Sequence, residues 1–288
     1  MSKFIFECID CKKHYIPSDV EYLCPECEKL NRPMQPLKGI LSCIYDYENI
    51  SKNFSRDEII ASEKKNFSRY LDILPIDSSD SILPLVTGPT PLRRAMKLEH
   101  VLGVDEIWVK DDTILPTGSF KDRASSVVVA IAAEKGIETI ATASTGNAAT
   151  ALAGMAASAE LSSVIFVPES APKAKLTQIA VYGGRLIPVK GTYDQAFELS
   201  IEACREYGWY NRNTAYNPFT IEGKKTAALE IWEQMEFSAP DWVVVPTGDG
   251  VILAGIEKGF SDLHRMGLIE KTPKLAVIQA EGCQPIVK

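Results

Sequence analysis

From residue 106 onward, short apolar runs alternate with longer segments of helical period, and this alternation restricts the fold more than any other feature of the sequence. The short runs, such as WVVVP at 242–246, predict buried strands, and the longer segments predict helices. Strands that alternate with helices form mostly parallel sheets covered by helices on both faces. We therefore predict an α/β fold, with strands at 106–110, 139–142, 163–167, 185–189, 242–246 and 274–279, and helices at 120–135, 146–160, 173–182, 193–207, 221–235 and 251–266.

The part of the chain before residue 106 lacks this alternation. A polar segment of helical character is predicted at 56–71. The stretch 75–91 is predicted to be a linker or a surface loop without regular structure, because prolines and glycine interrupt it repeatedly. These interrupting residues are Pro75, Pro84, Gly88, Pro89 and Pro91.

The charge of the chain is mildly acidic. Its 288 residues carry 31 Lys and Arg against 38 Asp and Glu, for a formal charge of −7, and no basic tract is present. Nucleic acids and anionic membranes are bound through clustered Lys and Arg, so we expect neither as a partner. No apolar run approaches the ~20 residues of a membrane span, and the start of the chain lacks a signal-peptide core. We expect a cytoplasmic protein.

Four cysteines near the N-terminus have the spacing of a metal site. Cys8, Cys11, Cys24 and Cys27 form C-x2-C-x12-C-x2-C, and two such pairs can present four thiolates to one tetrahedral ion. Structural zinc is the predicted occupant, and four protein ligands would leave no open position for catalysis. Two alternatives stay open: thiols without a metal, and a redox pair, which is disfavoured because no strand-helix pattern closely follows either CxxC.

The loop after the strand at 106–110 carries a lysine into a helix start. Ser119 is the predicted N-cap, which places Lys121 in the first helical turn. The positive end of the helix dipole disfavours an ammonium there and pushes Lys121 toward the neutral amine that Schiff-base chemistry requires. The alternative is a solvated lysine paired with Asp122.

The loop after the strand at 139–142 is a candidate anion site. It reads Ser144, Thr145, Gly146, Asn147 and leads into an alanine-rich helix. Two hydroxyls and the free amides of a helix N-terminus suit a carboxylate or a phosphate, and Asn147 adds an amide for a phenolic or carbonyl oxygen. The alternative is a tightly packed helix capped by Ser144.

A third loop follows the strand at 242–246. Gly248 and Gly250 flank Asp249 just before a helix, so backbone amides can wrap a phosphate. The dinucleotide pattern G-x-G-x-x-G fails at Leu253, and the Walker A pattern is absent from the sequence. We therefore expect a phosphate-binding loop for a ligand other than NAD or ATP.

The three loops are expected at one edge of the sheet, and together they suggest pyridoxal 5′-phosphate, which has a phosphate, an aldehyde and a phenolic oxygen. The chain also resembles a known family, the fold type II pyridoxal-phosphate enzymes, and within it the threonine synthase branch. The resemblance runs from about residue 36 to the end of the sequence. Its matching stretches are GPTPL (88–92), TGSFKDRA (117–124), STGNAATALA (144–153), IEGKKTAALEI (221–231), VVVPTGDGVILAGIEKGF (243–260) and QAEGCQPI (279–286).

The resemblance implies two three-layer αβα subdomains with mostly parallel sheets and the cofactor between them. Residues 36–288 would be the catalytic domain, incomplete at its C-terminus relative to the family, with a smaller mobile subdomain at about 126–210. Residues 1–35 would form the cysteine knuckle, which some family members also carry. A homodimer is expected.

The resemblance also implies residue roles. Lys121 would form the internal aldimine and act as acid and base, while Asn147 would bond the ring hydroxyl of the cofactor. The substrate carboxylate would lie at Ser144 and Thr145, with Lys175 as a further substrate contact. The cofactor phosphate would be held by the main-chain amides of Gly248, Asp249, Gly250, Val251 and Ile252.

The implied activity is that of a lyase of threonine biosynthesis that converts O-phosphohomoserine and water into threonine and phosphate. The sequence departs from the family at Thr220, where an arginine that contacts the substrate phosphate is expected. The residues that could supply this charge instead are Lys173, Lys175, Arg185 and Lys224. Two alternatives stay open: a related β-elimination or replacement enzyme acting on serine, threonine or phosphoserine, and a non-catalytic threonine-synthase-like binding protein.

Overall fold

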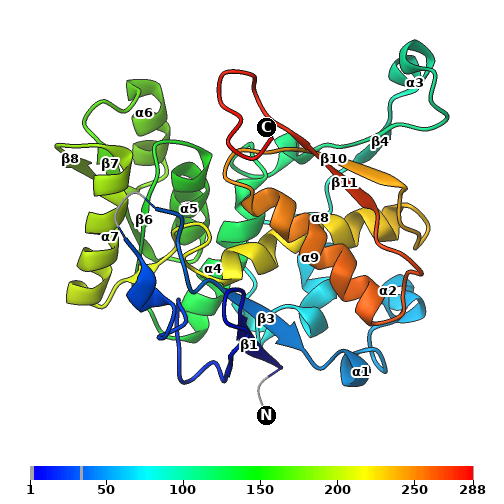
Figure 1. The fold of residues 1–288 in the computed structure, drawn as a ribbon, viewed down its shortest axis with the longest axis horizontal. Coiled ribbons are helices and arrows are strands. Elements are labelled where there is room, and N and C mark those ends of the chain that lie inside the picture. Colours follow the sequence, from blue (N-terminus) through cyan, green and yellow to red (C-terminus); the bar gives the residue numbers. More distant parts are fainter. Residues whose placement is uncertain (1–2, 33–34, 288) are drawn as a thin grey trace.

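A computed structural model gives the fold of residues 3–32 and 35–287 (Figure 1). The predicted α/β class is confirmed. The strands are β1 (Phe4–Cys8), β2 (His14–Tyr15), β3 (Leu41–Tyr45), β4 (Leu92–Arg94), β5 (Trp108–Lys110), β6 (Thr139–Ala143), β7 (Ser162–Pro168), β8 (Arg185–Val189), β9 (Tyr210–Asn211), β10 (Trp242–Pro246) and β11 (Lys274–Ile278). The helices are α1 (Tyr47–Ile50), α2 (Arg56–Ala61), α3 (Met96–Leu102), α4 (Lys121–Glu134), α5 (Asn147–Ser158), α6 (Lys173–Val181), α7 (Tyr193–Tyr207), α8 (Phe219–Gln234) and α9 (Val251–Arg265).

Every strand and helix predicted from residue 106 onward is present, with ends within two residues of the prediction. Helix α7 shows why the ends of helices could be predicted from the sequence. Its N-cap Thr192 forms a capping box with Gln195, in which each side chain accepts a hydrogen bond from the other residue's backbone amide. Gly208 ends the helix, as expected for a C-terminal glycine.

Three local predictions are wrong. The segment 56–71 is two pieces, because α2 ends where Ser62 turns extended and Asn66 caps a new 3-10 turn at Phe67–Ile73. A short 3-10 turn at Ser79–Ser81 lies inside the stretch 75–91, capped by the side chain of Ser78. Ser119 is not the N-cap of α4: Phe120 holds that position, without any side-chain cap.

A four-stranded parallel sheet of order β8-β7-β6-β9 is the largest sheet of the described chain. Helices α5, α6 and α7 surround it (Figure 1). On the other side of the molecule, β10 and β11 form a parallel pair, and β4 and β5 form an antiparallel pair. The predicted subdomain boundaries at about 126 and 210 stay a prediction.

Helices α4, α8 and α9 lie between these two parts and contact one another closely, with α8 against both others. A β-carbon placed on Gly255 of α9 would lie 2.4 Å from the β-carbon of Lys224 on α8, so only glycine permits this approach. The close packing brings the N-terminal halves of all three helices toward one region.

The N-terminal sheet, of order β2-β1-β3, packs on the start of α8. The rings of Phe4 and Phe6 lie 5.8 Å and 5.7 Å from the ring of Phe219. Strand β1 pairs with β3, which lies beyond residue 35 in the sequence. The boundary of the cysteine knuckle at residue 35 stays a prediction. No helix within 3–32 and 35–287 has the length and hydropathy of a bilayer-spanning segment.

Candidate active site

Lys121 is the first residue of α4 and is partly buried. Burial lowers the pKa of its ammonium, the carboxylate of Asp249 opposes this, and the guanidinium of Arg212 lowers the pKa further. Lys121 lies at the positive end of a helix, as predicted, and the structure adds burial and a nearby cation. All but Asp249 favour the neutral amine.

The alternative in which Lys121 pairs with Asp122 is not what the structure shows. The Asp122 carboxylate is fully buried and accepts hydrogen bonds from the amide and the hydroxyl of Thr117. Its neighbour Arg123 points away into a buried ion pair with Asp112 at 2.7 Å and with Glu230 of α8 at 2.6 Å. These contacts fix the start of α4 while leaving Lys121 free for other partners.

Two more cationic side chains, those of Lys224 and Arg212, interact electrostatically with the group around Lys121. Lys224 of α8 is fully buried, and its Nζ has no hydrogen-bond partner among the described residues. Burial holds the pKa of Lys224 well below its ordinary value, and repulsion from Arg212 and Lys121 lowers it further. The charge of a buried lysine is costly without an anion beside it.

Arg212 is also fully buried. Its Nε donates to the Ser125 hydroxyl at 3.2 Å and its Nη1 to the Thr214 hydroxyl at 2.9 Å, whereas Nη2 has no partner within the described part of the chain. Burial lowers the pKa of Arg212 to about 10, so the guanidinium still carries its charge at neutral pH.

A third buried polar atom without a partner in residues 3–32 and 35–287 is Oγ of Ser119, two residues before Lys121. An unsatisfied buried polar atom costs about 1–3 kcal/mol. One anionic ligand could accept from Lys224 and Arg212, and such charge-assisted bonds are the strong ones. The donor set around Lys121 is therefore suited to an anion.

Tyr193, the first residue of α7, connects the second loop to this cluster. Its hydroxyl donates to the Ala143 carbonyl, one residue before Ser144, at 3.3 Å. Burial raises the pKa of Tyr193, the Asp249 carboxylate raises it further, and Arg212 opposes the shift. The hydroxyl thus stands between the end of β6 and the charged groups around Lys121.

The second loop leaves Asn147 exposed, while the helix α5 that follows it is buried from Ala149 to Ala156. Asn147 is exposed at the first position of α5, and its Oδ1 accepts from Nζ of Lys175 at 3.1 Å. The predicted cofactor contact and the predicted substrate contact are therefore neighbours. Ser144 does not cap α5: its Oγ accepts from the Gly146 amide at 3.2 Å, and Gly146 holds the cap position. Thr145 is half-buried in the same loop.

The third loop leads into the start of α9, where amides of the first helical turn have no partner within the helix. Gly250 has φ +84°, which favours glycine, and it is the residue before the helix. The Val251 amide donates to the Asp249 side chain at 3.0 Å, and the remaining amides of the first turn have no partner within the helix. Space beside Gly248 is open, since no heavy atom lies within 4 Å of a β-carbon placed there. A phosphate fits this loop.

The four N-terminal cysteines come together. Their sulfur atoms all lie within 4.8 Å of one another, with Cys8 and Cys27 at 3.8 Å and Cys11 and Cys24 at 3.7 Å. Zinc–sulfur bonds of about 2.3 Å in a tetrahedron require sulfur atoms about 3.8 Å apart. The Tyr15 hydroxyl lies 3.1 Å from the Cys24 sulfur. The spacing and the donor chemistry fit zinc.

Several residues were not recognised from the sequence. Arg212 and Tyr193 had no motif to mark them, and Lys224 was named only as one of several cations. Two of those other cations, Lys173 and Arg185, are exposed. The sequence signal that could have identified Lys224 was its spacing from Thr220, which places both residues on one face of α8, one turn apart.

Comparison with known proteins agrees with this geometry. The family model described as "Pyridoxal-phosphate dependent enzyme" matches residues 83–288. The chain therefore belongs to the pyridoxal-phosphate dependent enzyme family, whose cofactor the three loops are suited to hold.

Within the family, the predicted resemblance to threonine synthase is confirmed. The chain is 38% identical to the threonine synthase of Methanocaldococcus jannaschii and 34% identical to that of Methanosarcina acetivorans, over 98% of its own length and 66% of theirs. It thus spans slightly less than two thirds of these relatives. Its fold is similar to that of threonine deaminase isoform 2 from Solanum lycopersicum, with TM-score 0.60 at 22% identity over 77% of this chain and 59% of that one.

Proposed function

We propose that this chain is a pyridoxal-phosphate-dependent lyase that converts O-phosphohomoserine and water into threonine and inorganic phosphate. The observation that carries the substrate assignment is the pair of buried cations beside Lys121, Lys224 and Arg212, each with an unpartnered donor atom among the described residues. The two relatives named threonine synthase support the same reaction.

The cofactor would be held by residues of all three loops. The amides of Gly248, Gly250 and Ile252 would bind its phosphate, and Asn147 would bond its ring hydroxyl. Pyridoxal phosphate supplies an electron sink that stabilises carbanionic charge on the substrate. Lys121 would anchor the aldehyde carbon and then, as a neutral amine, move a proton at the substrate α-carbon.

The substrate would lie with its two anionic ends at different elements. Ser144 and Thr145 would take the α-carboxylate at the start of α5, with Lys175 beside them. Lys224 and Arg212 would bind the phosphate that leaves from the γ-carbon, after which water adds at the β-carbon. Lys224 would thereby take over the charge of the arginine that is replaced by Thr220.

The direct test measures phosphate release from O-phosphohomoserine and the appearance of threonine, for the wild-type chain and for Lys224→Gln. Loss of a charge-assisted contact of about 1.5–3 kcal/mol should lower kcat/KM about 10- to 150-fold. The matched control is Lys173→Gln, an exposed lysine at the start of α6, which should leave kcat/KM unchanged.

The alternatives predict different results. A β-elimination enzyme would release ammonia from serine or threonine and leave O-phosphohomoserine intact, as the change at Thr220 would permit. A binding protein would retain the cofactor and turn over none of these substrates. Either result would refute the threonine synthase assignment.

We also propose a metal, an oligomeric state and a cellular location for this chain. The cysteine cluster would hold one structural zinc, supported by its sulfur spacing. A homodimer is supported by the exposed apolar residues of α3, among them Met96, Val101 and Leu102. A cytoplasmic location is supported by the seven cysteines, none of which is in a disulfide. Sedimentation analysis of the holoenzyme tests the dimer.

A further inference from the structure

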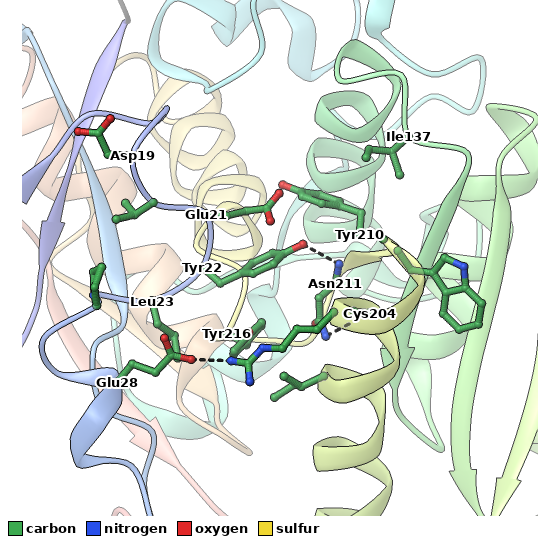
Figure 2. Close-up of a pocket in the computed structure, with 16 residues that line it drawn as sticks. Asp19, Glu21, Tyr22, Leu23, Glu28, Ile137, Cys204, Tyr210, Asn211 and Tyr216 are labelled. Carbon is green, nitrogen blue, oxygen red and sulfur yellow. Dashed lines mark hydrogen bonds and ion pairs between the residues drawn. The ribbon is translucent and has the colours of Figure 1, made fainter.

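A cavity of about 500 Å³ lies between the N-terminal segment and the four-stranded sheet, away from the loops described above. Figure 2 shows its two walls: residues from 19 to 28 on one side, and residues of α7, β9 and their connection on the other. Neither the proposed function nor the cysteine cluster accounts for this cavity.

Aromatic rings line much of the cavity. The rings of Tyr22 and Tyr216 stack at 4.9 Å, and those of Tyr22 and Tyr210 lie 5.8 Å apart. The Tyr22 hydroxyl accepts from the Asn211 amide at 2.9 Å, which ties the N-terminal segment to β9. Trp209 adds a fourth ring to the lining. The faces of such rings carry partial negative charge and attract cations.

The charged side chains of the lining have an acidic excess. Three carboxylates, those of Asp19, Glu21 and Glu28, face one guanidinium, that of Arg205. Arg205 is already bound to Glu28 at 2.6 Å, and Glu21 is paired with Lys135 at 3.3 Å, so Asp19 is the lining carboxylate without an ion-pair partner among the described residues.

The hydroxyl of Tyr210 supplies an independent sign of a ligand. Tyr210 is only 1% exposed, and its Oη has no hydrogen-bond partner among the described residues. The side-chain amide of Asn217, which lies near the Tyr210 hydroxyl, donates to the Asn211 carbonyl at 2.8 Å. In Figure 2 the Tyr210 hydroxyl is directed toward the Glu21 carboxylate. A buried hydroxyl of this kind is costly unless a ligand or water meets it.

The protein itself places an ammonium in this environment. Nζ of Lys135, just after α4, lies 3.3 Å from the Glu21 carboxylate and 5.0 Å from the centroid of the Tyr210 ring. This lysine is partly exposed at the edge of the cavity, with 42% of its side chain accessible. The same carboxylate and ring face can therefore receive a positively charged nitrogen.

We propose that this cavity binds a small organic ammonium ligand, whose charge takes the place of the Lys135 ammonium beside Glu21 and the Tyr210 face, with a polar group at the Tyr210 hydroxyl. An anion would meet the acidic excess of the lining, and a neutral apolar molecule would leave the Tyr210 hydroxyl unsatisfied. The site is separate from the cluster around Lys121, and it goes beyond the proposed lyase activity.

The test uses choline as the probe, because a quaternary nitrogen cannot react with a cofactor aldehyde. Binding to the holoenzyme is measured by isothermal titration calorimetry, beside the neutral isostere 3,3-dimethylbutan-1-ol. We expect choline to bind at least about fivefold more tightly than the isostere, as one cation–π and carboxylate contact implies. Glu21→Gln should remove most of this preference, and Tyr210→Phe should weaken choline binding.

The matched control is Glu106→Gln, an exposed carboxylate remote from the lining, which should leave choline binding unchanged. Glu21 is exposed at the surface, so its neutral variant is expected to fold, and circular dichroism checks this. Equal binding of choline and its isostere, no binding of choline at all, or undiminished preference in Glu21→Gln would each overturn the proposal.

Discussion

Lys224 lies one helical turn after Thr220 on α8, and its buried Nζ lacks a partner among the described residues, whereas the Thr220 hydroxyl donates to the Asn217 carbonyl at 2.8 Å. Thr220 is thus committed to the local backbone at the start of the helix. The positive charge stands one turn further along the helix than the family pattern places it. In the absence of an anion, this charge should cost stability.

We therefore predict that Lys224→Met stabilises the cofactor-free chain. Removing an unpaired buried ammonium should raise the free energy of unfolding by about 1–3 kcal/mol at pH 7. Because the pKa of Lys224 is lowered on folding, its penalty is largest at low pH and fades as pH rises toward the unfolded value of 10.5. The difference between variant and wild type in urea unfolding should shrink accordingly from pH 7 to pH 10.

The adjacent lysine gives a matched control of opposite sign. Lys225 is equally buried but is paired with Glu222 at 2.5 Å and with Asp262 at 2.9 Å. Lys225→Met should destabilise the chain by about 3–5 kcal/mol, because it leaves buried carboxylates uncompensated. If both variants shift stability in the same direction, Lys224 is not an unpaired charge.

A second prediction concerns the anchoring lysine. Borohydride reduction of the holoenzyme should fix the cofactor to Lys121, since burial and the nearby Arg212 lower its pKa and leave more of it as the reactive amine. Peptide mass spectrometry locates the label. Lys121→Ala should carry none, while Lys224→Met should still be labelled at Lys121. Label on Lys224 in the wild-type chain would reverse the two assignments.

The sequence predicted those parts of the fold whose signals are local. Helix α7 has a capping box at Thr192 and a terminal glycine at Gly208, so both ends could be read. Strand β9 has two residues, Tyr210 and Asn211, too few for any periodicity. Its place beside β6 depends on pairing over a long sequence separation, with Ile140 opposite Tyr210.

Residues of the candidate site were likewise predictable only where a local motif marks them. Lys121 and Asn147 stand in short motifs, so the residue pattern alone marks both of them. Arg212 follows the unrecognised strand β9, and its hydrogen-bond partner Ser125 comes from α4, far away in the sequence. Lys224 belongs to a helix that is buried on nearly every side, so no amphipathic pattern distinguished its environment.

A third prediction concerns the cysteine cluster. We expect one zinc per chain by mass spectrometry, lost together with cooperative folding of the N-terminal sheet in Cys8→Ser, because Cys8 ends β1. The exposed thiol of Cys283 lies outside the cluster, and Cys283→Ser should retain the metal. A metal-free chain with all thiols reduced and an intact N-terminal sheet would contradict the prediction.

The last prediction concerns the buried ion network that joins α8 to α9. The Asp262 carboxylate accepts from Lys225 at 2.9 Å, from Lys258 at 2.5 Å and from the Tyr47 hydroxyl at 2.8 Å. Asp262→Asn should lower the free energy of unfolding by about 3–5 kcal/mol, since two buried ammonium groups lose their shared partner. The control Asp241→Asn, in an exposed pair with Lys271, should cost less than about 1 kcal/mol.

The nearby lysines lower the pKa of Asp262 against the effect of burial, so its contribution is present near neutral pH and is lost as pH falls. Urea unfolding at pH 7 and at about pH 2.5, below the ordinary aspartate pKa of 3.8, should therefore show a smaller deficit for Asp262→Asn at the lower pH, and an unchanged deficit would show that the network stabilises the chain by packing alone.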